Sequence, residues 1–297
     1  MDKGLVRGYR LWSQTLACSS SKKVSGSEAF EGSSVAQQYM KFRQKVPDHV
    51  TKSILDNSQI SYKNESGKPA LVVDVGCGSG QFTQSLARYC DRVMGFDLSK
   101  GQIAEANRLI QMANLEFSVA PSDDLPLEDK SVDLMTVASA AHWFPLATFS
   151  AEAERVLRPG GVIAILTPLR RRVYHDEPMI QMDLHHCVAD CLKKMEHFAP
   201  IGHNDKEKFY CDLEFPFAPQ DEMIRYGIDY AVKHTPHTFT ELVKTMSYAV
   251  KYQQNNPDTS LFVDTEKRLH EIVQQSSSEE FKLITGYEIM IARKPDK

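Results

Sequence analysis

The sequence predicts an α/β protein with a doubly wound, mostly parallel sheet of seven strands, a helical N-terminal cap and a helical insertion toward the C-terminus. Three observations predict this fold. Between residues 70 and 166, short apolar runs alternate regularly with helical patterns. These runs are continuous rather than alternating, which is typical of parallel strands covered on both faces. The composition, 42% hydrophobic and 25% charged residues in a chain of 297, is that of a folded globular protein.

The helical cap comes first. Residues 30–60 predict mostly helix, with Pro47 opening a second helix because proline is tolerated in the first turn. A polar linker is expected at 61–69. The alternating part then predicts helices at 81–90, 101–112 and 145–157, and strands at 70–75, 91–96, 115–119, 131–138 and 162–166. The turn Arg158–Gly161 ends the last of these helices, and the crossovers are expected to be right-handed.

The last third of the chain has a different pattern. It predicts one or two helices over residues 173–198, a strand over 208–217, largely helical structure over 221–273 and a last strand over 281–292. We therefore divide the chain into four parts. They are an N-terminal segment (1–27), a helical cap (28–69), a core (70–170) and a part with substrate-side helices and closing strands (171–297).

Charge and composition limit the partners and the location. The net charge of −4 provides no basic surface for nucleic acid, and no apolar run approaches the about 18–20 residues of a membrane helix. The first 27 residues carry +4, so the rest carries −8. This serine-rich segment predicts a disordered or variable terminus or, alternatively, an organelle transit peptide. We expect a cytoplasmic protein with reduced cysteines, or a mitochondrial one if residues 1–27 are a transit peptide.

The segment Val72–Gly80 carries the chemical information. A buried strand ends there in a turn with glycines at 76, 78 and 80, and a helix follows from Gln81. Such a turn lets a ligand approach the main chain at the carboxyl edge of the sheet. A turn that binds nothing and a dinucleotide site are the alternatives. Gln81 stands where the dinucleotide fingerprint has Gly or Ala, and the Asp74 carboxylate suits a cationic ligand better than a pyrophosphate.

An acidic residue, Asp97, ends the second strand and can accept hydrogen bonds from ribose hydroxyls. With this residue included, the core resembles the class I S-adenosylmethionine-dependent methyltransferases, and in particular the type 11 group. The resemblance rests on five stretches in order: Val72–Gly80, Gly95–Ser99, Asp123–Leu134, Ala141–Phe144 and Glu154–Gly161.

The flanks are similar to those of small-molecule methyltransferases akin to eukaryotic trans-aconitate methyltransferase. This wider resemblance rests on Tyr39–Pro47 and Thr238–Tyr248 and extends over about residues 30–293, but only the core is close. The Arg-Pro that is usual after the first tyrosine is Arg43-Gln44 here.

The resemblance implies S-adenosylmethionine as the cofactor and assigns site residues. The turn, including Cys77, would contact the methionine part, with Asp74 near its ammonium group. Asp97 would hold the ribose. The remaining assignments are Leu98, Ser122 and Asp123 at the adenine, and Ser139 and His142 facing the sulfonium and the acceptor. Many relatives have an acid where Pro121 stands, so backbone groups would bind the adenine edge here.

Methyl transfer requires alignment of the acceptor, the methyl group and sulfur, and exclusion of water. A carboxylate acceptor needs no base, whereas a phenol, hydroxyl or ammonium acceptor benefits from one. His142 is the candidate base, with an orienting or packing role as the alternative, and Trp143 is expected as a wall of the acceptor pocket. Arg170 heads a run of three arginines that is either a solvated turn or a contact for an acidic acceptor. Tyr39 and Arg43 are lid candidates, with an amphipathic surface helix as the alternative.

The sequence therefore predicts an enzyme that transfers a methyl group to a small molecule, with a carboxylic acid as one acceptor class. The alternatives are a methyltransferase-like protein that binds the cofactor without turnover, and an NAD-linked oxidoreductase. We expect no metal, because the cluster of His and Cys between residues 185 and 197 lacks paired C-x-x-C spacing. We expect no nucleic acid or membrane partner, and a monomer or homodimer. The motifs of amino-methylases and protein arginine methyltransferases are not seen.

Overall fold

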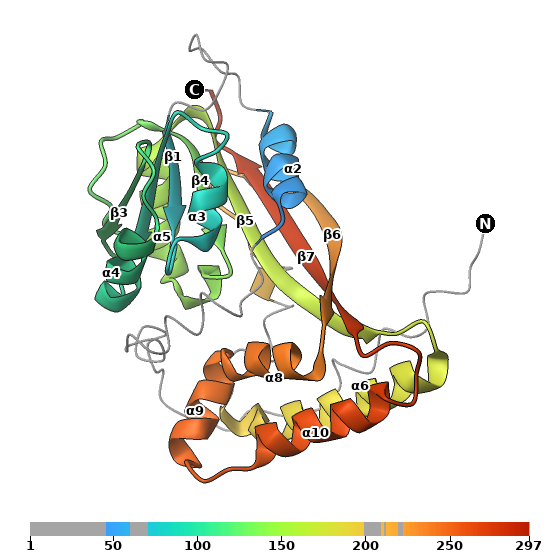
Figure 1. The fold of residues 1–297 in the computed structure, drawn as a ribbon. Coiled ribbons are helices and arrows are strands. Elements are labelled where there is room, and N and C mark those ends of the chain that lie inside the picture. The colour runs from blue at the N-terminus through green and yellow to red at the C-terminus, as the bar shows by residue number, and fades with distance from the viewer. Residues whose placement is uncertain (1–45, 60–70, 199–208, 211, 219–221, 297) are drawn as a thin grey trace, which may run out of the picture.

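The computed structural model describes residues 46–59, 71–198, 209–210, 212–218 and 222–296, except the side chain of Arg170 (Figure 1). Within these ranges the protein is built on one sheet of seven strands in the order β3-β2-β1-β4-β5-β7-β6. The strands are β1 (Leu71–Val75), β2 (Arg92–Asp97), β3 (Leu115–Val119), β4 (Val132–Ala138), β5 (Leu157–Tyr174), β6 (Ile224–His234) and β7 (Phe281–Arg293).

Strands β1 to β5 pair in parallel, whereas β7 is antiparallel to both β5 and β6. The predicted doubly wound, mostly parallel α/β fold is therefore confirmed. Because the parallel strands end at the same edge, the residues that follow β1, β2 and β4 are brought together there. Residues 1–27 and part of the predicted cap, including Tyr39 and Arg43, lie outside the described residues, and the proposed division into domains stays a prediction.

The sheet has an apolar layer on each face. On one face, helices α2 (Asp48–Ser58) and α3 (Gln81–Leu86) pack on Val72, Leu134 and Val162. On the other, helix α5 (Leu146–Val156) and the apolar residues of 209–210 and 212–218 pack on Val73, Met135 and Ile163. Neighbouring residues of β1 and β4 thus point to opposite faces, and both sets are buried, as the continuous apolar runs predicted.

Helix α4 (Lys100–Leu109) completes the core beside β2 and β3. Its apolar face forms a small cluster with Cys77 and Phe117. Ser99 caps this helix by accepting a hydrogen bond from the Gln102 amide at 3.3 Å. The cap fixes the start of α4 directly after Asp97.

The helical insertion forms a second apolar cluster at the far end of the long β5–β7 pair (Figure 1). It contains α6 (Pro178–Met195), α8 (Pro236–Lys244), α9 (Ser247–Asn255) and α10 (Leu261–Val273), and the short helix η3 (Glu196–Phe198) follows α6. Val173 of β5 and Phe281 of β7 join this cluster, so the strands connect the insertion to the sheet. None of the helices in the described ranges is long and apolar enough to cross a membrane.

Two predictions about the last third were wrong. The described residues of the range 208–217 do not form a strand: residues 209–210 are helical and Phe215 makes an isolated bridge to Ala218. The sixth strand is instead β6, inside the range predicted as largely helical. Its half-buried tyrosines alternate with exposed residues, and Tyr226 and Tyr230 contact α2 through Ser53 and His49. This period of two is the pattern of a strand with one covered face.

The fifth strand is also longer than predicted. It begins at Leu157, so residues 158–161 belong to the strand rather than to a turn, and it continues to Tyr174. The arginine run 170–172 is therefore paired with β7 and is not a solvated turn. Arg172 forms an ion pair with Asp229 of β6 at 3.0 Å.

Candidate functional site

The glycine turn joins β1 to α3 at the carboxyl edge of the sheet. Gly76, Gly78 and Gly80 have positive φ angles of 71°, 56° and 80°. A Cβ atom on Gly76 would lie 2.5 Å from Cβ of Ala140, and one on Gly80 would lie 2.4 Å from the Phe117 ring. A Cβ atom on Gly78 would approach Gln102 Oε1 no closer than 3.9 Å. The first and third glycines therefore permit close packing, whereas the second leaves an open backbone surface.

The carboxylate of Asp97 connects this turn to the end of β2. Its Oδ2 accepts a hydrogen bond from the Gly78 amide and its Oδ1 accepts one from the Ser99 amide, both at 2.8 Å. Burial raises the pKa of Asp97, while these two amide hydrogen bonds act in the opposite direction. Each carboxylate oxygen has a further lone pair, so Asp97 can still accept hydrogen bonds from ligand hydroxyls.

The amides of the turn are themselves engaged within the chain. The Gly76 and Cys77 amides both donate to the carbonyl oxygen of Phe96, at 2.7 and 3.0 Å. Burial, together with the nearby carboxylates, raises the pKa of the Cys77 thiol, so this thiol stays protonated. The turn thus offers an open backbone surface rather than a set of unpaired amides at these positions.

Asp74 lies fully buried beneath the turn. It accepts hydrogen bonds from the hydroxyls of Thr83 at 2.7 Å and Thr136 at 2.8 Å, and so connects β1 to α3 and β4. Burial raises its pKa to about 6, although both hydroxyls lower it. Both of these partners are neutral hydroxyls, and a buried carboxylate of this kind favours a cationic neighbour.

Gln102 is a residue that the sequence analysis missed. It lies in the first turn of α4, is 5% exposed, and its Oε1 has no hydrogen-bond partner among the described residues. A buried amide oxygen without a partner costs about 1–3 kcal/mol, so it points to a donor on a ligand. The available signal was its position in the first turn of the helix that follows Asp97, but that helix was predicted from its apolar residues alone.

The predicted adenine-side residues follow β2 and β3, which end side by side because Asp97 pairs with Val119. Leu98 is 59% exposed, an unusual position for a leucine at the edge of a sheet. Ser122 and Asp123 are half-buried, and Asp123 accepts a hydrogen bond from the Thr148 hydroxyl of α5 at 2.7 Å. These side chains therefore lie on the same edge as the glycine turn.

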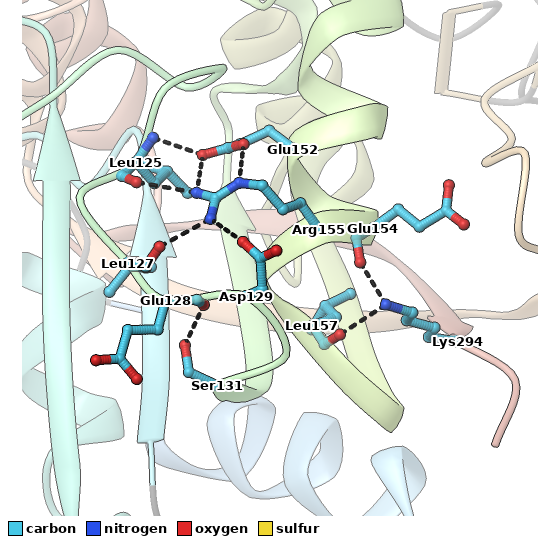
Figure 2. Close-up of polar contacts among 10 residues, drawn as sticks. All are labelled: Leu125, Leu127, Glu128, Asp129, Ser131, Glu152, Glu154, Arg155, Leu157 and Lys294. Atoms are coloured by element: carbon cyan, nitrogen blue, oxygen red, sulfur yellow. Dashed lines mark hydrogen bonds and ion pairs between the residues drawn. The ribbon is translucent and has the colours of Figure 1, made fainter. Parts of the chain in front are cut away.

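Arg155 of α5 fixes the loop that follows Asp123 (Figure 2). It donates to both carboxylate oxygens of Glu152 at 2.7 and 2.8 Å and to Asp129 at 2.7 Å. It also donates to the carbonyls of Leu125 and Leu127, at 3.1 and 2.8 Å. Glu152 in turn accepts from the Leu125 amide at 2.6 Å, and its pKa is lowered mainly by Arg155. The loop thus has a fixed position against α5.

The residues after β4 lie beside the glycine turn, because Ala140 is the neighbour of Gly76. Ser139 has a positive φ of 61° and donates its amide to the Leu166 carbonyl of β5 at 2.7 Å. The short helix η2 (Ala141–Trp143) follows. In it, the His142 ring lies 4.9 Å from the ring of Trp143, which is 37% exposed. The Ser139–Trp143 segment therefore lies at the same edge of the sheet as the glycine turn.

His142 contacts a partner that no sequence pattern indicated. Its Nδ1 lies 2.9 Å from the hydroxyl of Tyr210, a residue 68 positions later. Tyr210 is 1% exposed, and burial raises its pKa to about 12. It falls in the segment that we predicted as a strand, so its place beside His142 was not foreseen.

Two further predictions concern β5 and the helical insertion. Only the backbone of Arg170 is described, and it pairs with Gly286 in the middle of the β5–β7 ladder. The histidines and cysteines between residues 185 and 197 lie on α6 and η3, where Cys187 and Cys191 are buried in the helical cluster. Within the described part of the chain, no three His, Cys, Asp or Glu side chains gather as a metal ligand set.

Comparison with known proteins agrees with this geometry. Residues 73–165, which contain the glycine turn, Asp97 and His142, match the methyltransferase domain family. Residues 73–165 are therefore similar to methyltransferase domains. S-adenosylmethionine is the methyl donor of the class I methyltransferases that this core resembles.

Relatives of the methyltransferase domain cover part of the chain. A protein of Dictyostelium discoideum with a provisional methyltransferase name is 40% identical over 132 residues, 44% of this chain and 46% of the relative. The malonyl-acyl-carrier-protein O-methyltransferase of Hahella chejuensis is 36% identical over 124 residues, 40% of this chain and 44% of the relative. The chain thus spans less than half of the length of these relatives.

One solved structure extends the likeness to the whole fold. A protein of Anaeromyxobacter dehalogenans, provisionally described as a type II methyltransferase, aligns with 86% of this chain and 99% of its own, with a TM-score of 0.66 and 24% identity. This likeness shows a shared fold that includes the strands beyond the methyltransferase domain. The kinship with trans-aconitate methyltransferase stays a prediction.

Proposed function

We propose that the protein uses S-adenosylmethionine to methylate a small carboxylic acid at oxygen. One observation carries the cofactor part of this proposal: the buried Oε1 of Gln102, which has no hydrogen-bond partner among the described residues, lies beside Gly78, whose amide donates to Asp97. A donor group and a pair of hydroxyls on one ligand would satisfy both residues. The adenosyl part of S-adenosylmethionine has such groups.

We assign the cofactor contacts as follows. Asp97 accepts hydrogen bonds from the ribose hydroxyls, and Gln102 accepts one from a donor beside them. The exposed Leu98 packs against the adenine ring, and burial of its side chain would contribute about 1–2 kcal/mol. The remaining contacts are Ser122 and Asp123 at the adenine edge, Gly76, Cys77, Gly78 and Gly80 at the methionine part, Asp74 near its ammonium group, and Ser139 near the sulfonium.

When bound, the cofactor supplies a methyl group activated by a positively charged sulfur. An acceptor oxygen forms a bond to this carbon while the carbon–sulfur bond breaks and its electron pair stays on sulfur. A carboxylate is ionised at neutral pH because its ordinary pKa is near 4, so no proton has to leave. The chain's own task is then to hold the acceptor in line and to exclude water.

Two lines support a carboxylic acid as the acceptor. The Hahella relative is named as an O-methyltransferase of a malonyl group, and the sequence analysis predicts flanks similar to those of small-molecule methyltransferases akin to trans-aconitate methyltransferase. On the acceptor side we place His142 and Trp143. Tyr39, Arg43 and Arg170 are further substrate contacts in this proposal, because an arginine fork matches a carboxylate.

The test is turnover with defined acceptor classes. The full chain is incubated with S-adenosylmethionine and separate sets of di- and tricarboxylic acids, fatty acids, phenols and amines, and S-adenosylhomocysteine and the methylated product are measured by mass spectrometry. We expect methyl esters from one of the acid sets. Binding of S-adenosylhomocysteine without turnover in any set would favour a binding protein, and binding of NAD in its place would favour an oxidoreductase.

A further inference from the structure

We propose that Tyr210 holds the His142 imidazole in the tautomer with its proton on Nε2, so that His142 is a hydrogen-bond donor and not the general base. This inference rests on the proposed function and narrows its acceptor to one that is already ionised. It depends on one contact, the 2.9 Å approach of the Tyr210 hydroxyl to His142 Nδ1. Tyr210 is a positioning residue in this account, because it acts through His142.

The position of Tyr210 is fixed by its surroundings. The side chain is 1% exposed and belongs to the apolar core that includes Phe149 and Phe215. Its carbonyl accepts a hydrogen bond from Arg225 of β6 at 2.8 Å, and the same guanidinium donates to the Leu213 carbonyl. The hydroxyl is therefore presented to His142 by a segment that is attached to the sheet.

The direction of the hydrogen bond follows from the phenol. Burial keeps Tyr210 protonated, with a pKa of about 12, so its hydroxyl has one proton to donate. The Thr167 hydroxyl and the His142 backbone both lower this pKa, as groups that donate toward the phenol oxygen do. The Tyr210 proton is then left for Nδ1, which must accept it as an unprotonated nitrogen. A neutral imidazole that accepts at Nδ1 carries its own proton on Nε2.

The opposite tautomer requires these hydrogen bonds to run in the opposite direction. With a proton on Nδ1, the Tyr210 hydroxyl would accept from His142 and donate to Thr167. In that arrangement Thr167 would have to accept from Tyr210, whereas its lowering of the Tyr210 pKa indicates that it donates toward the phenol oxygen. The geometry thus favours donation from Tyr210 to Nδ1.

This tautomer selects the acceptor. When Nδ1 accepts the Tyr210 proton and Nε2 already carries its own, the imidazole has no free nitrogen that could remove a proton from the substrate. An acceptor that must be deprotonated is therefore disfavoured. A carboxylate fits: its oxygen forms the new bond to the methyl carbon, the electron pair of the broken carbon–sulfur bond stays on sulfur, and no proton moves. Nε2 lies across the ring from Nδ1, on the side away from Tyr210, and its N–H can hydrogen-bond to an anion.

The first test reads the tautomer directly. The full chain, with its 10 histidines labelled by nitrogen-15, is studied by NMR at pH 8, and the His142 signals are identified by their loss in His142→Gln. We expect an unprotonated Nδ1 and a protonated Nε2, and loss of this preference in Tyr210→Phe. Tyr226→Phe is the matched control, because Tyr226 also loses a hydroxyl contact, to Ser53 on the opposite face. A protonated Nδ1 in the wild type would overturn the proposal, whether or not the enzyme turns over.

The second test separates donor from base by kinetics. Glutamine keeps an N–H donor near the Nε2 position but cannot act as a base. We expect kcat of His142→Gln to fall by less than about tenfold and that of His142→Ala by about 10- to 100-fold. We expect a wild-type rate that does not fall between about pH 7.5 and 5.5, across the ordinary imidazole pKa. A loss of about 10²–10⁴-fold in both variants, with a rate that falls tenfold per pH unit in acid, would establish a base and refute the inference.

Discussion

Arg155 gives the sharpest quantitative prediction about the fold around the cofactor site. The change Arg155→Gln removes both hydrogen bonds to the Glu152 carboxylate and those to Asp129, Leu125 and Leu127 (Figure 2). The carboxylate of Glu152, only 9% exposed, then keeps just one of these partners, the Leu125 amide. The loop after Asp123 loses most of its attachment to α5.

The size of the effect follows from burial. Removing one partner of a fully buried ion pair costs about 3–5 kcal/mol, but the Arg155 side chain is 33% exposed, so water recovers part of that cost. Asp129 is 72% exposed and adds little. We expect the free energy of unfolding to fall by about 2–4 kcal/mol. The Arg155→Gln variant should also bind S-adenosylhomocysteine more weakly than the wild type, because the loop that carries Ser122 and Asp123 is less firmly attached.

Urea titration followed by circular dichroism measures the loss, with Arg92→Gln as the control. Arg92 also pairs with a glutamate, Glu116 at 3.1 Å, but both side chains are more than half exposed, so its loss should cost about 0–1 kcal/mol. Equal and small losses in the two variants would show that the Arg155 contacts do not hold the loop, and the reasoning from burial would be wrong.

Three further predictions concern the turn. Asp97→Asn replaces an accepting oxygen by a donor, so calorimetry should show S-adenosylhomocysteine affinity about 10- to 100-fold lower. The pKa of Asp74 in the native state, about 6, lies above its ordinary value of 3.8. The free energy of unfolding of the wild type therefore falls as the pH rises from the ordinary pKa to the native one. Asp74→Asn should gain about 3 kcal/mol relative to wild type between about pH 3.5 and 7 in urea titrations. Gly76→Ala, with a crowded Cβ and positive φ, should cost about 2–4 kcal/mol by the same method.

Each of these has a result that would contradict it. Unchanged affinity in Asp97→Asn would remove the ribose assignment. A constant difference between wild type and Asp74→Asn across that pH range would mean that the buried carboxyl does not titrate in the folded protein. For Gly76, the control is Gly101→Ala, where the nearest atom to the new Cβ is Ser99 Oγ at 3.9 Å and no positive φ is involved. A loss as large in Gly101→Ala would show that the packing argument fails.

The parallel half of the sheet could be predicted because its signals are local. Each apolar run with a glycine turn or an amphipathic helix after it specifies a strand without knowledge of its neighbours. The meeting of Asp97 with Gly78 also follows, since the ends of adjacent parallel strands share one edge. Sequence reasoning therefore predicted correctly which strand ends share this edge of the sheet, while the binding of a cofactor there stays a prediction.

The second half depends on contacts between distant segments. Strand β6 is stabilised by packing of Tyr226 and Tyr230 on α2, and its half-exposed alternation was outweighed by the helical residues that follow it. Tyr210 meets His142 across 68 residues, and no local pattern encodes that contact. Gln102 looks like any polar helical residue until the structure shows that its amide oxygen is buried. Such positions are fixed by tertiary packing, which spacing along the chain does not reveal.

The central claim is that the glycine turn, Asp97 and Gln102 together bind S-adenosylmethionine. Isothermal titration of the full chain with S-adenosylhomocysteine, repeated with Gln102→Ala and with NAD, tests it most directly. The account predicts binding of one S-adenosylhomocysteine per chain, clearly weaker binding by Gln102→Ala, and no heat of binding from NAD. Absence of S-adenosylhomocysteine binding by the folded wild type, or affinity that is the same in the variant, would contradict it.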